Sequence, residues 1–185
     1  EMSAPKVPAG SIGNNMQFHR RAHQLAYSID SAKGPSELFV LDPASGRSVQ
    51  WTRAKAPAGI DTSTFAEQTI VRWKSFDGLA ISGLLTRPPK TFTGKRPVII
   101  SIHGGPEAQA TMDFQGRWNY FIQELGIALI EPNVRGSSGY GKTFLTLDNG
   151  LKREDSVKDI GALLDWIAQQ PALDASRVLV TGGSY

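Results

Sequence analysis

Arg177-Val178-Leu179-Val180-Thr181-Gly182-Gly183-Ser184-Tyr185 is the stretch that decides the fold. Its apolar, β-preferring residues predict a buried strand, and two glycines and a serine follow directly. A serine on a tight turn between small neighbours is typical of a nucleophile elbow, in which the hydroxyl projects above a sheet. We therefore predict that Ser184 is a catalytic nucleophile. The last glycine of the Gly-x-Ser-x-Gly pattern would be residue 186, one position beyond the given sequence.

A second glycine-rich turn follows an earlier apolar run. Residues 97–102 predict a strand covered on both faces, and His103-Gly104-Gly105-Pro106 comes directly after it. In an α/β hydrolase this position holds part of the oxyanion hole, where backbone N–H groups meet the charge that develops on a carbonyl oxygen. The two motifs in this order favour acyl-transfer chemistry more strongly than either does alone.

The sequence between these two motifs alternates between helix and strand patterns. Trp118, Phe121 and Ile122 keep helical spacing, and residues 127–130 form another buried strand. A longer helix follows, with an apolar face predicted to consist of Val157, Ile160, Gly161, Leu164, Ile167 and Ala168. Such alternation predicts an α/β fold with a largely parallel sheet and helices on both faces. The chain ends within the opening half of that domain.

The N-terminal part of the sequence contains shorter β runs. Residues 25–29, 38–41 and 49–52 are separated by turn residues, the first turn running from Asp30 to Pro35, and they predict an antiparallel meander. A meander of this size cannot stand alone and belongs to a larger β array.

A linker at residues 54–64 separates this meander from a hairpin. Asp77-Gly78 is the predicted hairpin turn, between strands at 69–73 and 79–85. We place the domain boundary in the linker, so that residues 1–58 end a β domain and residues 59–185 begin the α/β domain.

The composition excludes several classes of function. The sequence has no cysteine, which excludes thiol catalysis and thiolate metal sites from these residues and leaves a cytoplasmic or a periplasmic location open. The net charge is +3 without a basic run, and no long apolar run occurs, so we expect neither a nucleic-acid nor a membrane partner. His19 and His23 have the spacing of a helical metal site. They lie beside a predicted strand without an acidic third ligand, and we interpret them as surface residues.

One further motif suggests a different function. Residues 136–143 fit the Gly-x₄-Gly-Lys-[Ser/Thr] pattern of a phosphate-binding P-loop. A P-loop opens a sustained helix, whereas Asp148-Asn149-Gly150 interrupts the chain within two turns. The next strand pattern supplies no acidic residue for Mg²⁺. Nucleotide binding therefore remains a remote alternative.

Taken in order, these motifs resemble the prolyl oligopeptidase family of serine peptidases. The resemblance extends from about residue 24 to the end of the chain. It rests on the final β runs of the N-terminal part, Trp73 to Gly78, His103-Gly104-Gly105-Pro106, the segment Asn133 to Gly141, and Gly182-Gly183-Ser184-Tyr185. It implies the N-terminal half of an α/β-hydrolase domain preceded by the last strands of a β-propeller. His103 stands where prolyl oligopeptidases proper and the dipeptidyl peptidase IV branch have a tyrosine, which makes the acylaminoacyl-peptidase-like branch more similar.

The resemblance also implies a mechanism and a substrate. Ser184 would be the nucleophile, and the backbone N–H groups of Tyr185 and Gly105 would form the oxyanion hole. His103 would shape the oxyanion loop and border the substrate. Short peptides would be hydrolysed through a covalent acyl-enzyme without a metal or an organic cofactor. The triad acid and base follow the serine in this fold, so we expect both beyond residue 185.

The motifs are also compatible with a second class of hydrolase. A carboxylesterase of the α/β-hydrolase fold uses the same elbow and the same glycine-rich loop, and only the meander favours a peptidase. Since the acid and base are expected beyond Ser184, we expect the 185 residues alone to be inactive. We also expect them to expose apolar sheet surface and to associate.

Overall fold

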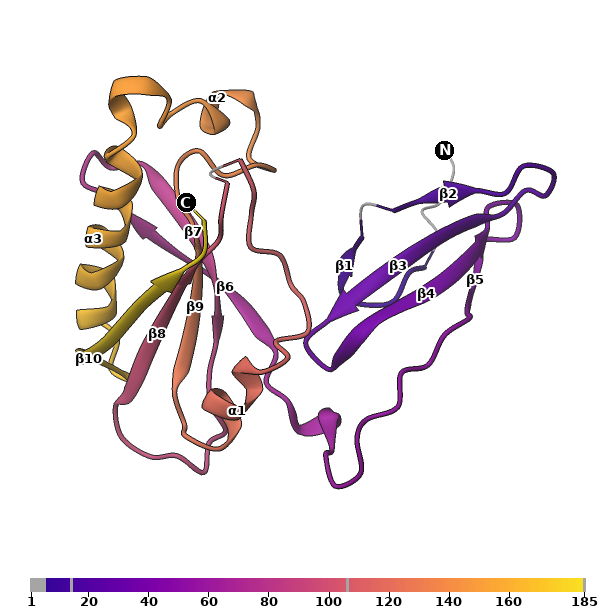
Figure 1. Cartoon of the computed structure of the whole chain (residues 1–185), viewed down its shortest axis with the longest axis horizontal. Helices are drawn as coiled ribbons and strands as arrows, with labels where there is room; N and C mark the ends of the chain where they lie inside the picture. Colours follow the sequence, from indigo (N-terminus) through magenta and orange to yellow (C-terminus); the bar gives the residue numbers. More distant parts are fainter. Residues whose placement is uncertain (1–5, 14, 106, 185) are drawn as a thin grey trace. The chain divides into compact units, whose positions relative to one another are not determined.

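The computed structural model describes residues 6–13, 15–105 and 107–184 (Figure 1). The chain divides into two compact units. The N-terminal unit comprises Glu1–Phe65 and Met112–Gly116, and the C-terminal unit comprises Ala66–Thr111 and Arg117–Tyr185. No helix of the described residues is long and apolar enough to cross a lipid bilayer.

The N-terminal unit is built on one antiparallel sheet. Its strands are β1 (Ser11–Ile12), β2 (Gln17–Phe18), β3 (Leu25–Ser31), β4 (Gly34–Asp42) and β5 (Arg47–Gln50). Their order is β1-β3-β4-β5, with β2 also paired to β3, which confirms the predicted meander. The predicted turn from Asp30 to Pro35 is too long, because Ser31 pairs with Gly34 and only two residues connect the strands. A 3₁₀ turn at Thr62–Thr64 ends the segment that was predicted as a linker.

The core of this unit lies on one face of the sheet. Tyr27, Ile29 and Leu41 are buried, and Leu25 and Phe39 pack against them. Tyr27 and Phe39 are cross-strand partners with ring centroids 5.7 Å apart. The alternation of buried Tyr27 and Ile29 along β3 follows from the two-residue period of a strand.

The C-terminal unit contains a mixed five-stranded sheet and two covering helices (Figure 1). Its strands are β6 (Gln68–Lys74), β7 (Ala80–Thr86), β8 (Arg96–Ile102), β9 (Ala128–Asn133) and β10 (Leu173–Gly182), in the order β10-β8-β9-β7-β6. Its helices are α1 (Trp118–Gln123), α2 (Lys142–Leu145) and α3 (Asp155–Ala168), with a 3₁₀ turn at Gly150–Lys152. Strands β10, β8 and β9 are parallel, whereas the predicted β6–β7 hairpin is antiparallel and joins β9 through β7.

Helices α1 and α3 cover opposite faces of this sheet. Ile99 of β8 and Leu129 of β9 form a cluster with Ile122 of α1. The alternate residues on these strands, Val98, Ile100, Ala128 and Ile130, form the main core with Leu163 and Ile167 of α3. Side chains alternate between faces along a strand, so these two clusters confirm the prediction of helices on both faces.

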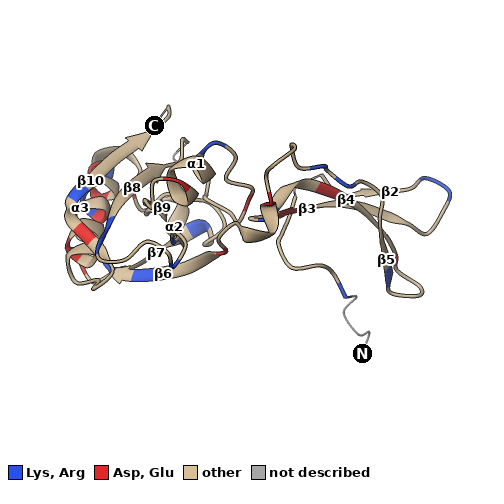
Figure 2. Ribbon diagram, turned by 90° about the horizontal axis from the view of Figure 1, so that it is seen from below, with Lys and Arg blue, Asp and Glu red and all other residues tan. Residues whose placement is uncertain are grey.

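The predicted apolar face of α3 is wrong at most of its positions, although Ile167 is buried as predicted. Val157 is 67% exposed and Leu164 is 39% exposed, while the buried positions are Ser156, Asp159, Leu163 and Ile167. The helix is rotated because the Asp159 carboxylate pairs with the buried Arg135 side chain. On the exposed side Lys158 pairs with Asp155 at 2.7 Å, and Figure 2 shows acidic and basic residues interspersed along α3.

The prediction that β10 is a buried strand is also wrong. Strand β10 lies at the edge of the sheet, where β8 is its only neighbour among the described residues (Figure 1). Leu179 is 57% exposed and Val180 is 47% exposed. An apolar run predicts a strand but does not show which strands flank it. The exposure of Leu179 and Val180 agrees with the expectation that these 185 residues expose apolar sheet surface.

Candidate active site

Two parallel neighbouring strands bring the glycine-rich motifs together. Strand β8 ends at Ile102 and β10 ends at Gly182, and these two residues are register partners. Both strands point the same way, so the segments that follow them leave the sheet at the same edge. His103-Gly104-Gly105 and Gly183-Ser184 are these segments.

Gly104 lies against the serine turn. A Cβ atom built on Gly104 would lie 2.9 Å from the carbonyl oxygen of Gly183 and 3.2 Å from Ser184 Cβ. The same point is 3.8 Å from Ser184 Oγ. Glycine is therefore required at residue 104 for the two backbones to approach this closely.

Ser184 has the backbone conformation of a sharp turn. Its φ is +73°, and it is the only non-glycine residue in the described part of the chain with a positive φ. This left-handed conformation is rare for side chains other than glycine and clusters at functional sites. The side chain is exposed, and Oγ has no hydrogen-bond partner among the described residues.

Gly105 presents an uncommitted amide beside this turn. Its φ is +130°, and a Cβ would lie 2.6 Å from Glu107 N, so the loop demands glycine here as well. Within the described ranges, the Gly105 N–H meets no hydrogen-bond acceptor. Tyr185, the second predicted oxyanion donor, lies outside the described residues, as does Pro106.

Comparison with known proteins shows which family the chain resembles. Residues 113–185 match the prolyl oligopeptidase family. Dipeptidyl aminopeptidase BIII of Pseudoxanthomonas mexicana is 32% identical over 87% of this chain, and the acylamino-acid-releasing enzyme of Rattus norvegicus is 29% identical over 80%. The chain is thus similar to the prolyl oligopeptidase family. It spans about a quarter of the length of these relatives, 24% and 21% respectively.

Solved structures share the fold. A prolyl endopeptidase structure matches with a TM-score of 0.82 over 96% of this chain and 26% of its own, at 19% sequence identity. At that identity the match supports the fold alone. The structural match agrees with the mixed α/β sheet of the C-terminal unit, and the sequence relatives confirm the family resemblance derived from the motifs.

His103 is held by a hydrogen bond on each ring nitrogen. Nδ1 lies 2.8 Å from the carbonyl oxygen of Gly104, and Nε2 lies 3.0 Å from Ser137 Oγ. The ring is partly buried and Ser137 is fully buried. His103 therefore connects the glycine-rich loop to the segment that follows β9.

Residues 133–141 are bonded at two more places to Ala108 and Ala110, which follow the glycine-rich loop. The Asn133 side chain accepts a hydrogen bond from Ala110 N at 2.7 Å and donates one to Ala110 O at 3.0 Å. Ser138 N donates to Ala108 O at 2.8 Å. Tyr140 OH accepts from Asn133 Nδ2 at 3.0 Å. The two loops are thus one hydrogen-bonded unit beside Ser184.

A buried ion pair between Arg135 and Asp159 anchors the segment at residues 133–141 to α3. Arg135 donates from Nη2 to Asp159 Oδ1 at 2.8 Å and from Nη1 to Asp77 Oδ2 at 2.9 Å. Its backbone N–H also donates to Asp159 at 2.9 Å. Ser75 Oγ donates to the same carboxylate, and Trp73 Nε1 donates to Asp159 O at 3.2 Å. One guanidinium therefore joins the β6–β7 hairpin, α3 and the loop after β9.

This network shifts the pKa values of its members in opposite directions. Burial disfavours the charged guanidinium, but hydrogen bonds with Asp159 and Asp77 outweigh it and raise the pKa of Arg135. The hydrogen bond from Arg135 lowers the pKa of the Asp77 carboxyl, against a smaller effect of burial. Both shifts favour the ionised pair.

The P-loop look-alike has a different structure from a nucleotide site. Helix α2 has only four residues, Lys142–Leu145, so no sustained helix follows the glycines, as the sequence predicted. A Cβ on Gly136 would meet the Asp148 carboxylate at 2.3 Å. A carboxylate at this point opposes a bound phosphate. The segment instead supports the glycine-rich loop.

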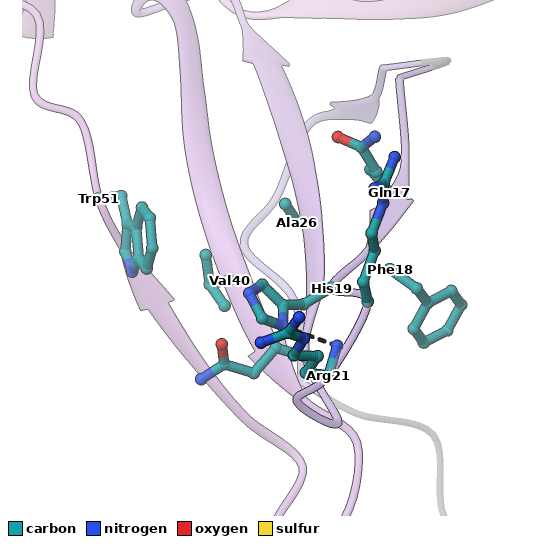
Figure 3. Close-up of a pocket in the computed structure, with 9 residues that line it drawn as sticks. Gln17, Phe18, His19, Arg21, Ala26, Val40 and Trp51 are labelled. Atoms are coloured by element: carbon teal, nitrogen blue, oxygen red, sulfur yellow. Dashed lines mark hydrogen bonds between the residues drawn. The ribbon is translucent and has the colours of Figure 1, made fainter.

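A separate pocket lies on the N-terminal unit (Figure 3). It has a volume of about 650 Å³, and Ala26, Val40, Phe18 and Trp51 are among the residues that line it. His19 lines it, and Nδ1 of His19 accepts hydrogen bonds from the backbone N–H groups of Arg21 and Ala22 at 3.2 and 2.9 Å. No group of three His, Cys, Asp or Glu side chains suited to a metal ion occurs in the described part of the chain.

Four residues of this region had no role in the sequence analysis. They are Asn133, Arg135, Ser137 and Asp159. The first three lie inside the family segment, where glycines dominate the pattern. Asp159 could have been found, because it shares a helical stripe with Leu163 and Ile167, and a carboxylate in an apolar stripe signals a buried cation.

Proposed function

We propose that the protein carrying this chain is a serine peptidase that hydrolyses short peptides through a covalent acyl-enzyme. The proposal rests chiefly on the contact between the two motifs: a Cβ on Gly104 would lie 3.2 Å from Ser184 Cβ. A nucleophile and an oxyanion loop must lie this close to act on one carbonyl group. The positive φ of Ser184 and the uncommitted Gly105 amide support the same assignment.

In this mechanism Ser184 Oγ attacks the scissile carbonyl carbon while a histidine beyond residue 185 takes its proton. The carbonyl oxygen becomes an oxyanion and accepts hydrogen bonds from the N–H groups of Gly105 and Tyr185. The peptide C–N bond then breaks, the amine leaves with the proton from the histidine, and an ester to Ser184 remains. Water hydrolyses this ester and restores the serine. His103 borders the carbonyl site rather than acting as the base.

The domain organisation follows from the same assignment. We place the last strands of a β-propeller at residues 1–58 and the first half of an α/β-hydrolase domain at residues 59–185. The relatives named above are a dipeptidyl aminopeptidase and an acylamino-acid-releasing enzyme. One name describes an aminopeptidase and the other an enzyme that releases acylated amino acids, and we assign peptide substrates to the full-length protein.

The test uses the full-length protein and a fluorophosphonate probe. We expect covalent labelling at Ser184, loss of labelling in Ser184→Ala, and normal labelling in Ser176→Ala, an exposed serine near the N-terminal part of β10. Hydrolysis of short peptide amides should be lost with the label. Absence of labelling in the unaltered protein would contradict the proposal. Cleavage of short esters with no cleavage of amides would favour the carboxylesterase alternative.

A further inference from the structure

Gln109 presents a side-chain amide close to the proposed oxyanion loop, and we propose that this amide binds the main chain of the peptide substrate. Gln109 is then a specificity-determining residue that favours substrates with a peptide backbone. The inference rests on the proposed function and deepens it. It concerns recognition of the substrate rather than the chemistry at Ser184.

A tight turn connects Gln109 to the proposed oxyanion donor. A Cβ on Gly105 would lie 2.9 Å from the backbone nitrogen of Ala108, so the loop folds back on Gly105 at this point. Gln109 follows directly. Successive residues of an extended peptide lie about 3.3 Å apart. A substrate whose scissile carbonyl faces Gly105 therefore has neighbouring peptide units within reach of the Gln109 side chain.

The backbone on both sides of Gln109 is held by the segment that follows β9. Ser138 N donates to Ala108 O at 2.8 Å. The Asn133 side chain accepts from Ala110 N at 2.7 Å and donates to Ala110 O at 3.0 Å. These hydrogen bonds fix the two residues that flank Gln109. A group on a restrained backbone loses less conformational entropy when it binds a ligand.

Gly139 leaves room for the Gln109 side chain. Its φ is +86°, and a Cβ at this position would collide with Gln109 Oε1. The same Cβ would lie 2.9 Å from Gln109 Cδ and 3.0 Å from Nε2. The amide therefore lies directly against the Gly139 backbone, and only glycine allows this approach.

The Gln109 amide keeps its hydrogen-bonding groups free for a ligand. Neither Oε1 nor Nε2 has a hydrogen-bond partner among the described residues, and Gln109 is exposed. An amide side chain offers N–H donors and a carbonyl acceptor, which match the C=O and the N–H of a peptide unit. Ligand sites fix the orientation of the ligand with a few polar groups of this kind. A simple ester offers no N–H to Oε1, so the residue favours peptides.

The test measures the hydrolysis of short peptide amides by the full-length protein. Gln109→Met keeps the length of the side chain and removes its hydrogen bonds. It should raise KM by about 5–10-fold and leave kcat within about twofold, because a contact away from the scissile bond is made equally in the ground state and in the transition state. Hydrolysis of a short-chain p-nitrophenyl ester, which has no peptide unit, should be unchanged.

A change in the substrate identifies the contact directly. In a set of peptides, each amide N–H other than the scissile one is replaced in turn by an ester oxygen. One replacement should raise KM several-fold for the unaltered protein. It should have no further effect in Gln109→Met, because the two changes remove the same hydrogen bond. Gln169→Ala, at an exposed glutamine that ends α3, is the matched control and should leave every KM unchanged.

The inference is overturned if folded Gln109→Met has a KM within about twofold of that of the unaltered protein. It is equally overturned if every ester replacement keeps its full effect in this variant. A fall in kcat at constant KM would also overturn it, because Gln109 would then act through the oxyanion loop. Thermal unfolding checks the fold of each variant. These outcomes leave fluorophosphonate labelling of Ser184 intact, whereas failure of that labelling in the unaltered protein would contradict the proposed function.

Discussion

Arg135 and Asp159 form a buried ion pair that joins the segment after β9 to α3. Nη2 of Arg135 lies 2.8 Å from Oδ1 of Asp159, and the side chains are 4% and 0% exposed. Arg135 is two residues from Ser137, which contacts His103. The position of the His103 imidazole therefore depends on the loop after β9, which Asp159 of α3 holds in place through Arg135. Two buried charges are tolerated here because Ser75 and the Arg135 backbone supply further hydrogen bonds to Asp159.

Removing the Asp159 charge should strongly destabilise the full-length protein. Asp159→Ala leaves the Arg135 guanidinium buried without its main partner, and we expect a loss of about 3–5 kcal/mol in the free energy of unfolding. Lys158→Ala is the control, because Lys158 is half exposed and its ion pair with Asp155 on the outer side of α3 should contribute little. Urea unfolding measures both. Equal effects of the two substitutions would contradict a special role for the buried pair.

Stability should fall in acid because of Asp77. The hydrogen bond from Arg135 lowers the pKa of Asp77 below its ordinary value of 3.8. The folded state therefore favours the ionised carboxylate. Its contribution is complete above pH 3.8 and is lost as the pH falls through the lower, folded-state value. Because the carboxylate is 41% exposed, the contribution is small.

Asp77→Asn provides the comparison for this pH dependence. The variant should be less stable than the unaltered protein at pH 6, and the difference should shrink as the pH is lowered below about 4. Urea unfolding at a series of pH values measures the difference. A constant difference across the series would show that Asp77 acts through packing rather than through its charge.

Much of the fold could be predicted from local sequence patterns. The β6–β7 hairpin follows from Asp77-Gly78, and the strands β8 and β9 follow from apolar runs. The site motifs were also visible, because glycines before a serine and after a strand have few structural uses. Their proximity was predictable once both strands were assigned to one parallel sheet, since parallel neighbours end at the same edge.

The sequence did not show which polar residues are buried. The sequence pattern places the apolar Val157 and Leu164 toward the core and the charged Asp159 toward solvent. In the structure Asp159 is buried instead, because it pairs with Arg135, whose position is not visible in the sequence. The edge position of β10 has a similar cause, because an apolar run carries no information about its neighbours. The link from His103 to Ser137 spans 34 residues and has no local signature.

A methyl group on Gly104 should impair catalysis without unfolding the protein. In Gly104→Ala the new Cβ would meet Gly183 O at 2.9 Å and Ser184 Cβ at 3.2 Å, so the serine turn must shift. A displacement of about 1 Å lowers kcat by on the order of 10²-fold. Peptide hydrolysis measures kcat, and thermal unfolding checks the fold.

Gly161→Ala is the matched control for this substitution. A Cβ at this helical position has no atom within 4 Å, so kcat should be unchanged and stability should rise by about 1 kcal/mol. Unchanged kcat in Gly104→Ala would show that the oxyanion loop and the serine turn can separate without cost.

Lys142 should have no role in nucleotide binding. The four-residue α2 and the Asp148 carboxylate against Gly136 leave no phosphate cradle. We expect no heat of binding when Mg²⁺-ATP is titrated into the full-length protein, and Lys142→Ala should retain full peptide hydrolysis. Micromolar ATP binding that Lys142→Ala abolishes would revive the P-loop alternative.

The isolated 185-residue chain should associate and should lack hydrolytic activity. Strand β10 lies at a sheet edge with Leu179 57% and Val180 47% exposed, and edges of this kind pair with other chains. Light scattering after size exclusion should show a mass that rises with concentration, and Leu179→Lys should lower it. Leu151→Lys is the control, because Leu151 is fully exposed but lies away from the sheet. Equal effects of both lysines would point to net charge rather than to the edge. Turnover of a peptide amide that depends on Ser184 would contradict the expected absence of activity, because it would require a base within these residues.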